Sequence, residues 1–188
     1  MAGEGRRGGG TREKIQQVAL ELFAEQGYDK TSLREIAERL EVTKAALYYH
    51  FRTKDDIVAS LFDDYIAKID QIIDWASAQG EITNEIRREI VRRYATILGE
   101  PGAGIMKFIQ GNQSTMRELK IGQNLAGRFM AFSNLLIDKS TPLKTQIRSA
   151  MAMGMLHVGM FAPIAIDATP EERRVAALEA VLEMIPED

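Results

Sequence analysis

Apolar residues recur along the chain at spacings of three and four, which is the period of an α-helix. The first such stretch begins near Arg12 and is stopped by Gly27, a residue type that often ends helices. From residue 54 onward no stretch alternates apolar and polar residues as a strand would. The pattern predicts an all-α protein of about nine helices.

Residues 31–54 predict two short helices with only a few residues between them. In the first, Ser32 and Glu35, three residues apart, match a capping box. The second begins near Thr43, a residue type that favours the N-cap position. Two short helices at this spacing are typical of a helix-turn-helix.

The second of these helices divides into two faces when residues are placed about 100° apart. The expected inward face contains Ala46, Leu47, His50 and Phe51. The expected outward face contains Lys44, Ala45, Tyr48 and Tyr49. Exposed aromatic rings reduce solubility unless they contact a partner. A cation beside two hydroxyl-bearing rings suits the phosphates and base edges of a DNA major groove.

A third helix is expected to start at Lys54, capped by Thr53 with Asp56. Lys54 would then lie beside a helix N-terminus, where free amides favour an anion such as phosphate.

This segment resembles the DNA-binding domain of the TetR (tetracycline repressor) family of bacterial transcription regulators. The resemblance covers about residues 12–60, with an opening helix ending in AEQGYDKTS, followed by REIAERL and VTKAALYYHFRTKDDI. The sequence departs from the family at Glu41, where Gly is usual because the turn often needs a positive φ. A non-Gly residue there costs on the order of 1 kcal/mol, so we expect a strained or differently shaped turn.

The helix faces and the resemblance together select a set of candidate DNA-binding residues. Groove contacts are expected mainly from the outward face of the second helix, and phosphate contacts from hydroxyl, imidazole and ammonium groups around it. The full set is Thr31, Ser32, Thr43, Lys44, Ala45, Tyr48, Tyr49, His50 and Lys54.

The charge distribution agrees with a DNA-facing N-terminal part. The net charge is −3, but residues 1–54 carry ten Lys and Arg against eight Asp and Glu, whereas residues 55–188 carry fourteen against nineteen. The contrast is modest, so binding should depend on a few placed cations.

Several classes of function lack the residues they need. There is no Cys, and the two histidines, His50 and His157, are far apart, so we expect no metal site and no cofactor. Gly99 and Gly104 have the spacing of a phosphate-binding loop, but Ile105 occupies the position of the required lysine. We expect no enzymatic activity. The first ten residues have no apolar core and do not read as a secretory signal, so a cytoplasmic protein is expected.

Three regions are expected along the chain. Residues 1–10 contain five Gly with two Arg and should form a disordered arm, either a solvated tail or an arm that reaches a minor groove. Residues 11–55 form the helix-turn-helix domain. Residues 56–188 form a helical domain that, as the resemblance implies, binds an effector and dimerises.

The helical domain is expected to open with a long helix over 54–80 and a second over 81–98. The second should turn Arg87, Arg88, Arg92 and Arg93 outward, as a solvated face pairing with glutamates or as a second contact to DNA or an acidic ligand. A linker over 99–104 and helices over 104–120 and 122–139 follow.

Residues 149–166 contain no Asp, Glu, Lys or Arg. A membrane span is one interpretation. We favour a helix buried on nearly all sides, with Gly154 and Gly159 allowing close approach of another helix. Paired with the last helix, over 170–185, it would form the interface of a homodimer, as the resemblance also implies.

The resemblance further implies a site for a small-molecule effector in the helical domain. Methionine beside aromatic rings suits an adaptable apolar cavity, although plain core is the alternative for each residue. The candidates are Trp75, Tyr94, Met106, Phe108, Asn112, Met116, Phe129, Phe132, Met155 and His157.

The sequence therefore predicts a homodimeric transcription regulator, more specifically a repressor, that binds a palindromic operator in double-stranded DNA and is released by a largely apolar effector. Two alternatives stay open. The protein could be a helix-turn-helix regulator without an effector, or an adaptor whose helix-turn-helix binds protein.

Overall fold

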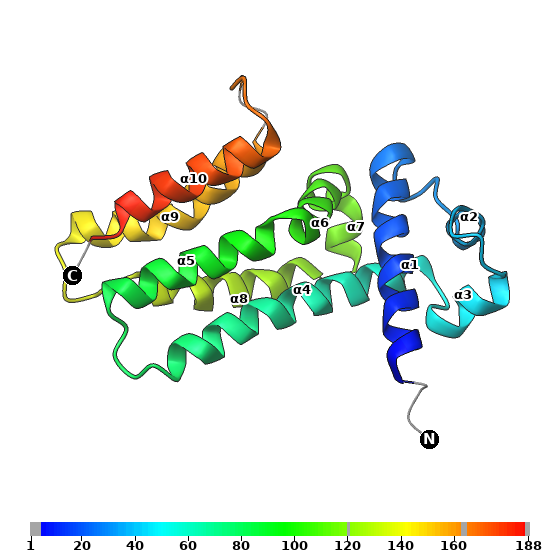
Figure 1. Cartoon of the computed structure of the whole chain (residues 1–188), viewed down its shortest axis with the longest axis horizontal. Coiled ribbons are helices and arrows are strands. Elements are labelled where there is room, and N and C mark those ends of the chain that lie inside the picture. Colours follow the sequence, from blue (N-terminus) through cyan, green and yellow to red (C-terminus); the bar gives the residue numbers. More distant parts are fainter. Residues whose placement is uncertain (1–4, 120, 163–164, 187–188) are drawn as a thin grey trace. The chain divides into compact units, whose positions relative to one another are not determined.

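The computed structural model describes residues 5–119, 121–162 and 165–186, and all regular structure within these ranges is helical (Figure 1). The all-α prediction is confirmed. The helices are α1 (Gly5–Gln26), α2 (Leu33–Arg39), α3 (Lys44–His50), α4 (Lys54–Ser77), α5 (Asn84–Leu98), α6 (Glu100–Gly111), α7 (Gln113–Glu118), α8 (Ile121–Leu136), α9 (Leu143–Phe161) and α10 (Pro170–Met184). The described ranges thus hold ten helices. The expected helix over 104–120 is divided at Asn112, whose φ of −132° and ψ of 47° are not helical.

The helices group into two compact units. The first comprises the chain up to Asp64 together with Gly104–Gln123, and the second comprises Tyr65–Ala103 together with the chain from Asn124 onward. The division falls inside α4, α6 and α8, so each of these helices contributes to both units.

Helix α1 begins at Gly5, earlier than the start near Arg12 that the apolar pattern predicts. Residues 1–4 of the expected arm lie outside the described residues. The helix ends as expected, because Gly27 adopts a φ of +91° and its amide donates to the carbonyl oxygen of Phe23 at 3.1 Å. Ile15 and Phe23 are buried and form part of the core of the first unit.

The helix-turn-helix consists of α2 and α3. The capping box of Ser32 and Glu35 begins α2, and Thr43 caps α3 by accepting the amide of Ala46 at 3.2 Å. Glu41 in the turn has a φ of +56°, the left-handed conformation for which Gly is favoured. The expected strain at this turn is therefore present.

In the second unit, α5 packs on the C-terminal half of α4. The two helices run in opposite directions in Figure 1, and their buried residues include Ile69, Ile72, Ile90 and Val91. An ion pair of 3.3 Å between Arg128 and Asp70 ties α8 to α4.

Two arginines of α5 correct the prediction of a wholly solvated arginine face. Arg87 is only 8% exposed, and its guanidinium donates to Asn84 Oδ1 at 3.0 Å. Arg88 donates to the carbonyl oxygens of Leu182 and Ile185 at the end of α10. Arg87 also lies 3.5 Å from Asp138, which follows α8. Arg87 and Arg88 thus each join a distant segment to α5.

Arg92 and Arg93 keep the predicted arrangement. Arg92 lies 3.0 Å from Glu85, and Arg93 lies 2.8 Å from Glu89.

The expected linker over 99–104 is largely helical. Gly99 caps α5, and its carbonyl oxygen accepts the amides of Gly102 and Ala103 at 3.0 and 2.9 Å. These bonds start α6 at Glu100. The linker prediction was wrong because Pro101 suits the first turn of a helix, where no amide is needed.

Helices α9 and α10 lie side by side in Figure 1, and Gly159 permits their contact. A Cβ added at Gly159 would lie 2.6 Å from the Cβ of Ala177. The opposite face of α9 is exposed in the single chain, so the prediction of burial on nearly all sides was wrong for one chain. This face contains Ile147, Met151, Met155 and Val158, with exposures of 41–60%.

Among the described residues, no helix has the length and apolar character needed to cross a membrane.

Candidate nucleic-acid interface

Helix α3 has one buried anchor and an exposed aromatic face. Leu47 is fully buried, and Phe51, which follows the helix, is 4% exposed. Tyr48 and Tyr49 are 51% and 86% exposed. The structure thus turns both phenol rings to solvent.

Two further residues of α3 complete this face. Lys44 and Ala45 are exposed together with the tyrosines. Ala46 is exposed as well, which corrects its expected inward position. We call Lys44, Ala45, Tyr48 and Tyr49 the α3 face.

His50 lies at the edge of the α3 face. It is half-buried, and its ring meets Tyr49 in a T-shaped arrangement with the centroids 5.2 Å apart. The contact orients the ring of Tyr49, which is the more exposed of the two tyrosines.

The hydroxyl groups before α2 have different environments. Ser32 Oγ donates to Glu35 Oε2 at 2.7 Å and accepts the amide of Glu35 at 3.2 Å. The bonds from the Ser32 side chain and backbone lower the pKa of the Glu35 carboxyl. Thr31 is 1% exposed, and its hydroxyl donates to the carbonyl oxygen of Gly27 at 2.8 Å. Its burial corrects the expectation of a phosphate contact, because Thr31 supports the connection between α1 and α2.

Lys54 is partly exposed and is held from one side by Tyr28. Its Nζ donates to the carbonyl oxygen of Tyr28 at 2.6 Å and lies 4.3 Å from the centroid of the tyrosine ring. The Tyr28 hydroxyl in turn donates to Asp55. Burial and this bond to Asp55 raise the pKa of Tyr28.

The N-terminus of α4 is capped by its own sequence. Asp56 accepts the amides of Arg52 and Thr53 at 3.1 and 2.9 Å, and its own amide donates to Thr53 Oγ1 at 3.0 Å. The cap by Thr53 was predicted. The carboxylate of Asp56 thus binds two amides that precede α4, and the Thr53 hydroxyl binds one amide of its first turn.

A polar cluster behind α3 was missed from sequence. The Arg12 guanidinium lies 5.3 Å from the Phe51 ring centroid and 3.3 Å from Asp64. Gln16, one turn further along α1, donates to Asp64 at 2.7 Å and to Ser60 at 2.9 Å. Polar residues four apart on α1 beside its apolar face were the available signal.

Four of the expected effector-site residues meet in the second unit. Tyr94 lies 4.9 Å from Phe132 and 5.6 Å from His157, and Phe129 lies 5.3 Å from His157, all between ring centroids. We call these four residues the Tyr94 cluster.

A directed chain of hydrogen bonds runs through the Tyr94 cluster. His157 Nδ1 lies 2.8 Å from the carbonyl oxygen of Met153, which can only accept, so Nδ1 carries the proton. Nε2 then accepts from Tyr94 at 3.0 Å, and Tyr94 accepts from Tyr65 at 2.9 Å. Burial lowers the pKa of His157. Tyr65, the first donor in this series of hydrogen bonds, was not among the expected effector residues.

The other six expected effector residues do not join this cluster. Phe108 and Met116 are buried in the first unit, and Asn112 precedes α7 there. Met106 is half-buried in the same unit. In the second unit, Trp75 is stacked by Arg93 at 3.8 Å, and Met155 is 41% exposed. Four of the ten expected residues thus belong to the first unit and six to the second.

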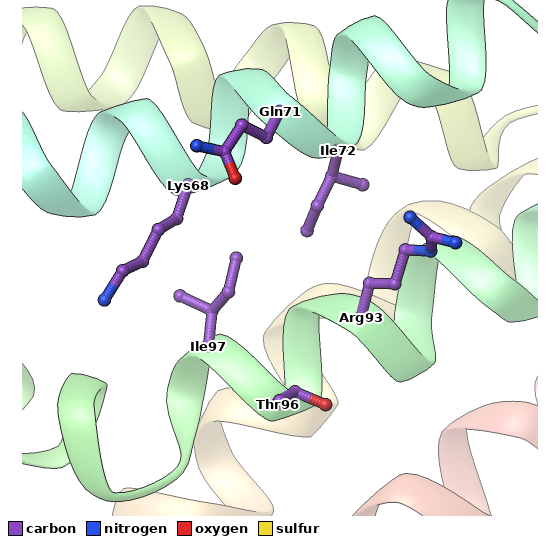
Figure 2. A pocket seen from close by; sticks show the side chains of 6 residues that line it. All are labelled: Lys68, Gln71, Ile72, Arg93, Thr96 and Ile97. Atoms are coloured by element: carbon purple, nitrogen blue, oxygen red, sulfur yellow. The ribbon is translucent and has the colours of Figure 1, made fainter.

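An open groove of about 250 Å³ lies between α4 and α5. Figure 2 shows Ile72 and Ile97 facing each other across it, with Lys68 and Arg93 at its edges. Its lining consists of Lys68, Gln71, Ile72, Arg93, Thr96 and Ile97, none of which was among the expected effector residues.

Within the described ranges, no group of three His, Asp or Glu side chains could hold a metal ion.

The comparisons with known proteins match this chain to regulators. Residues 15–61 match the family model described as bacterial regulatory proteins, tetR family. The HTH-type transcriptional regulator AcrR of Shigella flexneri is 28% identical over 195 residues, covering 93% of this chain and 88% of AcrR. The icaADBC biofilm operon negative regulator IcaR of Staphylococcus aureus is 48% identical over 46 residues, which cover 24% of this chain and 25% of IcaR.

Solved structures share the fold at low sequence identity. Mycobacterium smegmatis AmtR superposes with a TM-score of 0.65 at 23% identity, covering all of this chain and 90% of AmtR. A TerR/AcrR family regulator from Aquifex aeolicus VF5 gives a TM-score of 0.64 at 20% identity, covering 91% of this chain and 97% of that one.

Proposed function

This chain belongs to the tetR family of bacterial regulatory proteins and is a DNA-binding transcriptional regulator; we propose that it is a repressor that binds a palindromic operator as a homodimer. We further propose that a small-molecule effector releases it. Such a regulator acts in the cytoplasm, where its DNA is.

The observation that carries the proposal is the α3 face. Tyr49 is 86% exposed on a helix of only seven residues whose anchor, Leu47, is fully buried. An α-helix fits the major groove of B-DNA, and tyrosine hydroxyls and lysine can reach phosphates and base edges there. In this proposal Lys44, Tyr48 and Tyr49 contact the groove, and Ser32, Thr43, His50 and Lys54 lie along the phosphates.

The homodimer is proposed from α9 and α10. Solvent exposure of Ile147, Met151 and Val158 on one helix face is unfavourable in a single chain and is relieved when a second copy covers it. Twofold pairing would present two α3 helices to one duplex. A palindrome is read only when their separation is about one DNA turn or a multiple of it.

Release is proposed to follow from a change in that separation. An effector that binds better to the arrangement unable to straddle the duplex shifts the population toward it. Helix α4 is the proposed link, because it is continuous from Lys54 beside α3 to Ser77 in the second unit. The Tyr94 cluster is the proposed place for a largely apolar effector.

A regulator without an effector is the second candidate. It is favoured by the direct ring contacts within the Tyr94 cluster, which fill the space that a ligand would need. Binding of the effector-free protein to DNA would be the same, so the two candidates differ only in release.

The proposed function is tested by selection of sheared genomic DNA on the immobilised full-length protein. We expect enrichment of a small number of fragments that share a palindrome. Lys44→Ala should weaken binding to these fragments by about tenfold to a hundredfold, since a base contact contributes about 1–3 kcal/mol. The control Lys144→Ala removes an exposed lysine of the second unit and should bind normally. Equal binding by both variants, or no enrichment at all, would refute DNA recognition by α3, and the latter would favour a protein-binding adaptor.

A further inference from the structure

The ammonium group of Lys54, four residues after the end of α3, is held by neighbouring groups of the protein. A free lysine side chain has several rotatable bonds, and holding it on a phosphate costs conformational entropy. Here Nζ is already fixed by the carbonyl oxygen of Tyr28 at 2.6 Å and by the ring at 4.3 Å. The carbonyl oxygen of Asp29 also accepts from Nζ, at 3.5 Å. The two carbonyl oxygens leave one of the three N–H groups of the ammonium for a phosphate.

Tyr28 is itself fixed at both ends of its side chain. Its hydroxyl donates to Asp55, the residue that follows Lys54. Its ring packs 5.1 Å from Phe23 of α1 and 6.0 Å from Phe108 of α6, in centroid distance. Tyr28 is 9% exposed, so its ring has little freedom to move without its neighbours.

Phe108 connects the Tyr28 ring to α6. Its ring lies 5.5 Å from Phe23, 6.0 Å from Tyr28 and 6.2 Å from Phe62, and it is 3% exposed. All of these residues belong to the first unit. A shift of Phe108 in this packed core would displace the Tyr28 ring, because close-packed rings leave no empty space to absorb it.

We propose that Tyr28 is a positioning residue for Lys54, and that Phe108 of α6, through its packing on the Tyr28 ring, sets how strongly Lys54 holds a DNA phosphate. This inference depends on the proposed function, since it concerns the same DNA surface. It assigns a role in DNA affinity to two buried aromatic residues outside the α3 face.

The experiment measures binding of the full-length protein to a labelled duplex selected from genomic DNA, by fluorescence anisotropy over a range of salt concentrations. The salt slope counts the phosphates that are neutralised, at about 0.9 per phosphate. Lys54→Ala should lower the slope by about one and weaken binding to all duplexes alike. The losses of salt slope and affinity in this variant are the largest that Tyr28 variants should cause through Lys54.

Tyr28→Leu should reproduce the effect of Lys54→Ala in part or in full. Loss of the ring should weaken binding by about threefold to tenfold, from the usual strength of a cation–π contact. The Tyr28→Leu/Lys54→Ala double variant should bind no more weakly than Lys54→Ala alone. Tyr28→Phe keeps the ring and the backbone carbonyl, and it should keep the wild-type salt slope.

Phe108→Leu and Phe62→Leu form a matched pair that keeps the test valid if Tyr28→Leu does not fold. Phe62 is 2% exposed and packs on Phe108, and it has no ring contact with Tyr28 within the described residues. Both variants should lose similar stability in urea unfolding. Only Phe108→Leu should lower the salt slope and the affinity.

The outcomes separate the two proposals. If the wild type binds no selected duplex, the proposed function fails. If the wild type binds but Tyr28→Leu and Phe108→Leu keep its slope and affinity, or if Tyr28→Leu binds more tightly, the positioning role is overturned and the regulator stands. Additive losses in the double variant would also overturn it.

Discussion

The α3 face and the exposed face of α9 differ in chemistry and therefore in the partner each suits. The α3 face combines two phenol hydroxyl groups with a lysine. The α9 face presents only aliphatic and thioether groups, such as Met151 at 60% exposure. Groups that can hydrogen-bond suit a polyanion, whereas aliphatic groups are stabilised by an equally apolar surface. Exposure alone is thus a poor guide to function. The functional groups of the exposed side chains determine which partner a surface can bind.

The largest expected effect comes from placing a charge on the α9 face. Met151→Glu would bury an unpaired carboxylate between two copies, so we expect a monomer in light scattering. Affinity for the selected palindrome should fall by about a hundredfold or more, because the second half-site is no longer bound intramolecularly.

The matched control is Met130→Glu. Met130 is 68% exposed on α8, a helix that is not part of the proposed interface, and this variant should stay dimeric. A dimeric Met151→Glu protein would show that α9 does not form the interface.

On the α3 face, Tyr49→Ala should reduce affinity for the selected duplex by about tenfold to a hundredfold, within the range of a base contact. Tyr49→Phe separates the two parts of the side chain. If the hydroxyl makes the contact, both variants lose affinity; if the ring does, only Tyr49→Ala does. Anisotropy titrations of both variants at one salt concentration give the answer, and wild-type affinity in Tyr49→Ala would remove this residue from the contact set.

The two capping boxes permit a smaller and more controlled comparison between the two units. Ser32 with Glu35 begins α2, and Thr169 with Glu172 begins α10 with the same bonding pattern. Ser32→Ala and Thr169→Ala should each lower the free energy of unfolding by about 1 kcal/mol.

Only Ser32→Ala should also weaken DNA binding, because α2 supports α3. Urea unfolding checks the first expectation and anisotropy the second. Equal DNA binding by both variants would show that the α2 cap does not matter for the interface.

The smallest expected effect is on the pH dependence of stability. Burial lowers the pKa of His157, so the unfolded chain binds a proton more readily than the folded one. Stability should be fully present above the unfolded pKa of about 6.5 and should decline as the pH falls below it.

His157→Gln should reduce this decline, as measured by thermal unfolding between pH 7.5 and 5. If the stability of His157→Gln declined as steeply as that of the wild type, titratable groups other than His157 would cause the pH dependence.

Local features of the first unit could be predicted because they depend on residues close in sequence. The division of α3 into two faces follows from helical geometry. The positive φ at Glu41 was expected from the resemblance, because Gly is usual at this position of the turn. The caps by Ser32 and Thr53 follow from residue types three positions apart.

Features that depend on distant segments could not be predicted. Lys54 meets the carbonyl of Tyr28 across 26 positions, and Arg88 meets Leu182 across 94. The expected effector set was divided because the chain returns to the first unit at Gly104, which takes Phe108 into a different core from Tyr94. Periodicity identifies an apolar face but does not tell which core it enters.

DNA binding by the α3 face can be measured best with the Lys44→Ala/Tyr49→Ala double variant. Both side chains are exposed, so the variant should unfold at the wild-type urea concentration. In anisotropy titrations against the selected duplex, we expect its affinity to be lower than that of the wild type by at least about a hundredfold. Wild-type affinity in this double variant would contradict DNA binding by the α3 face.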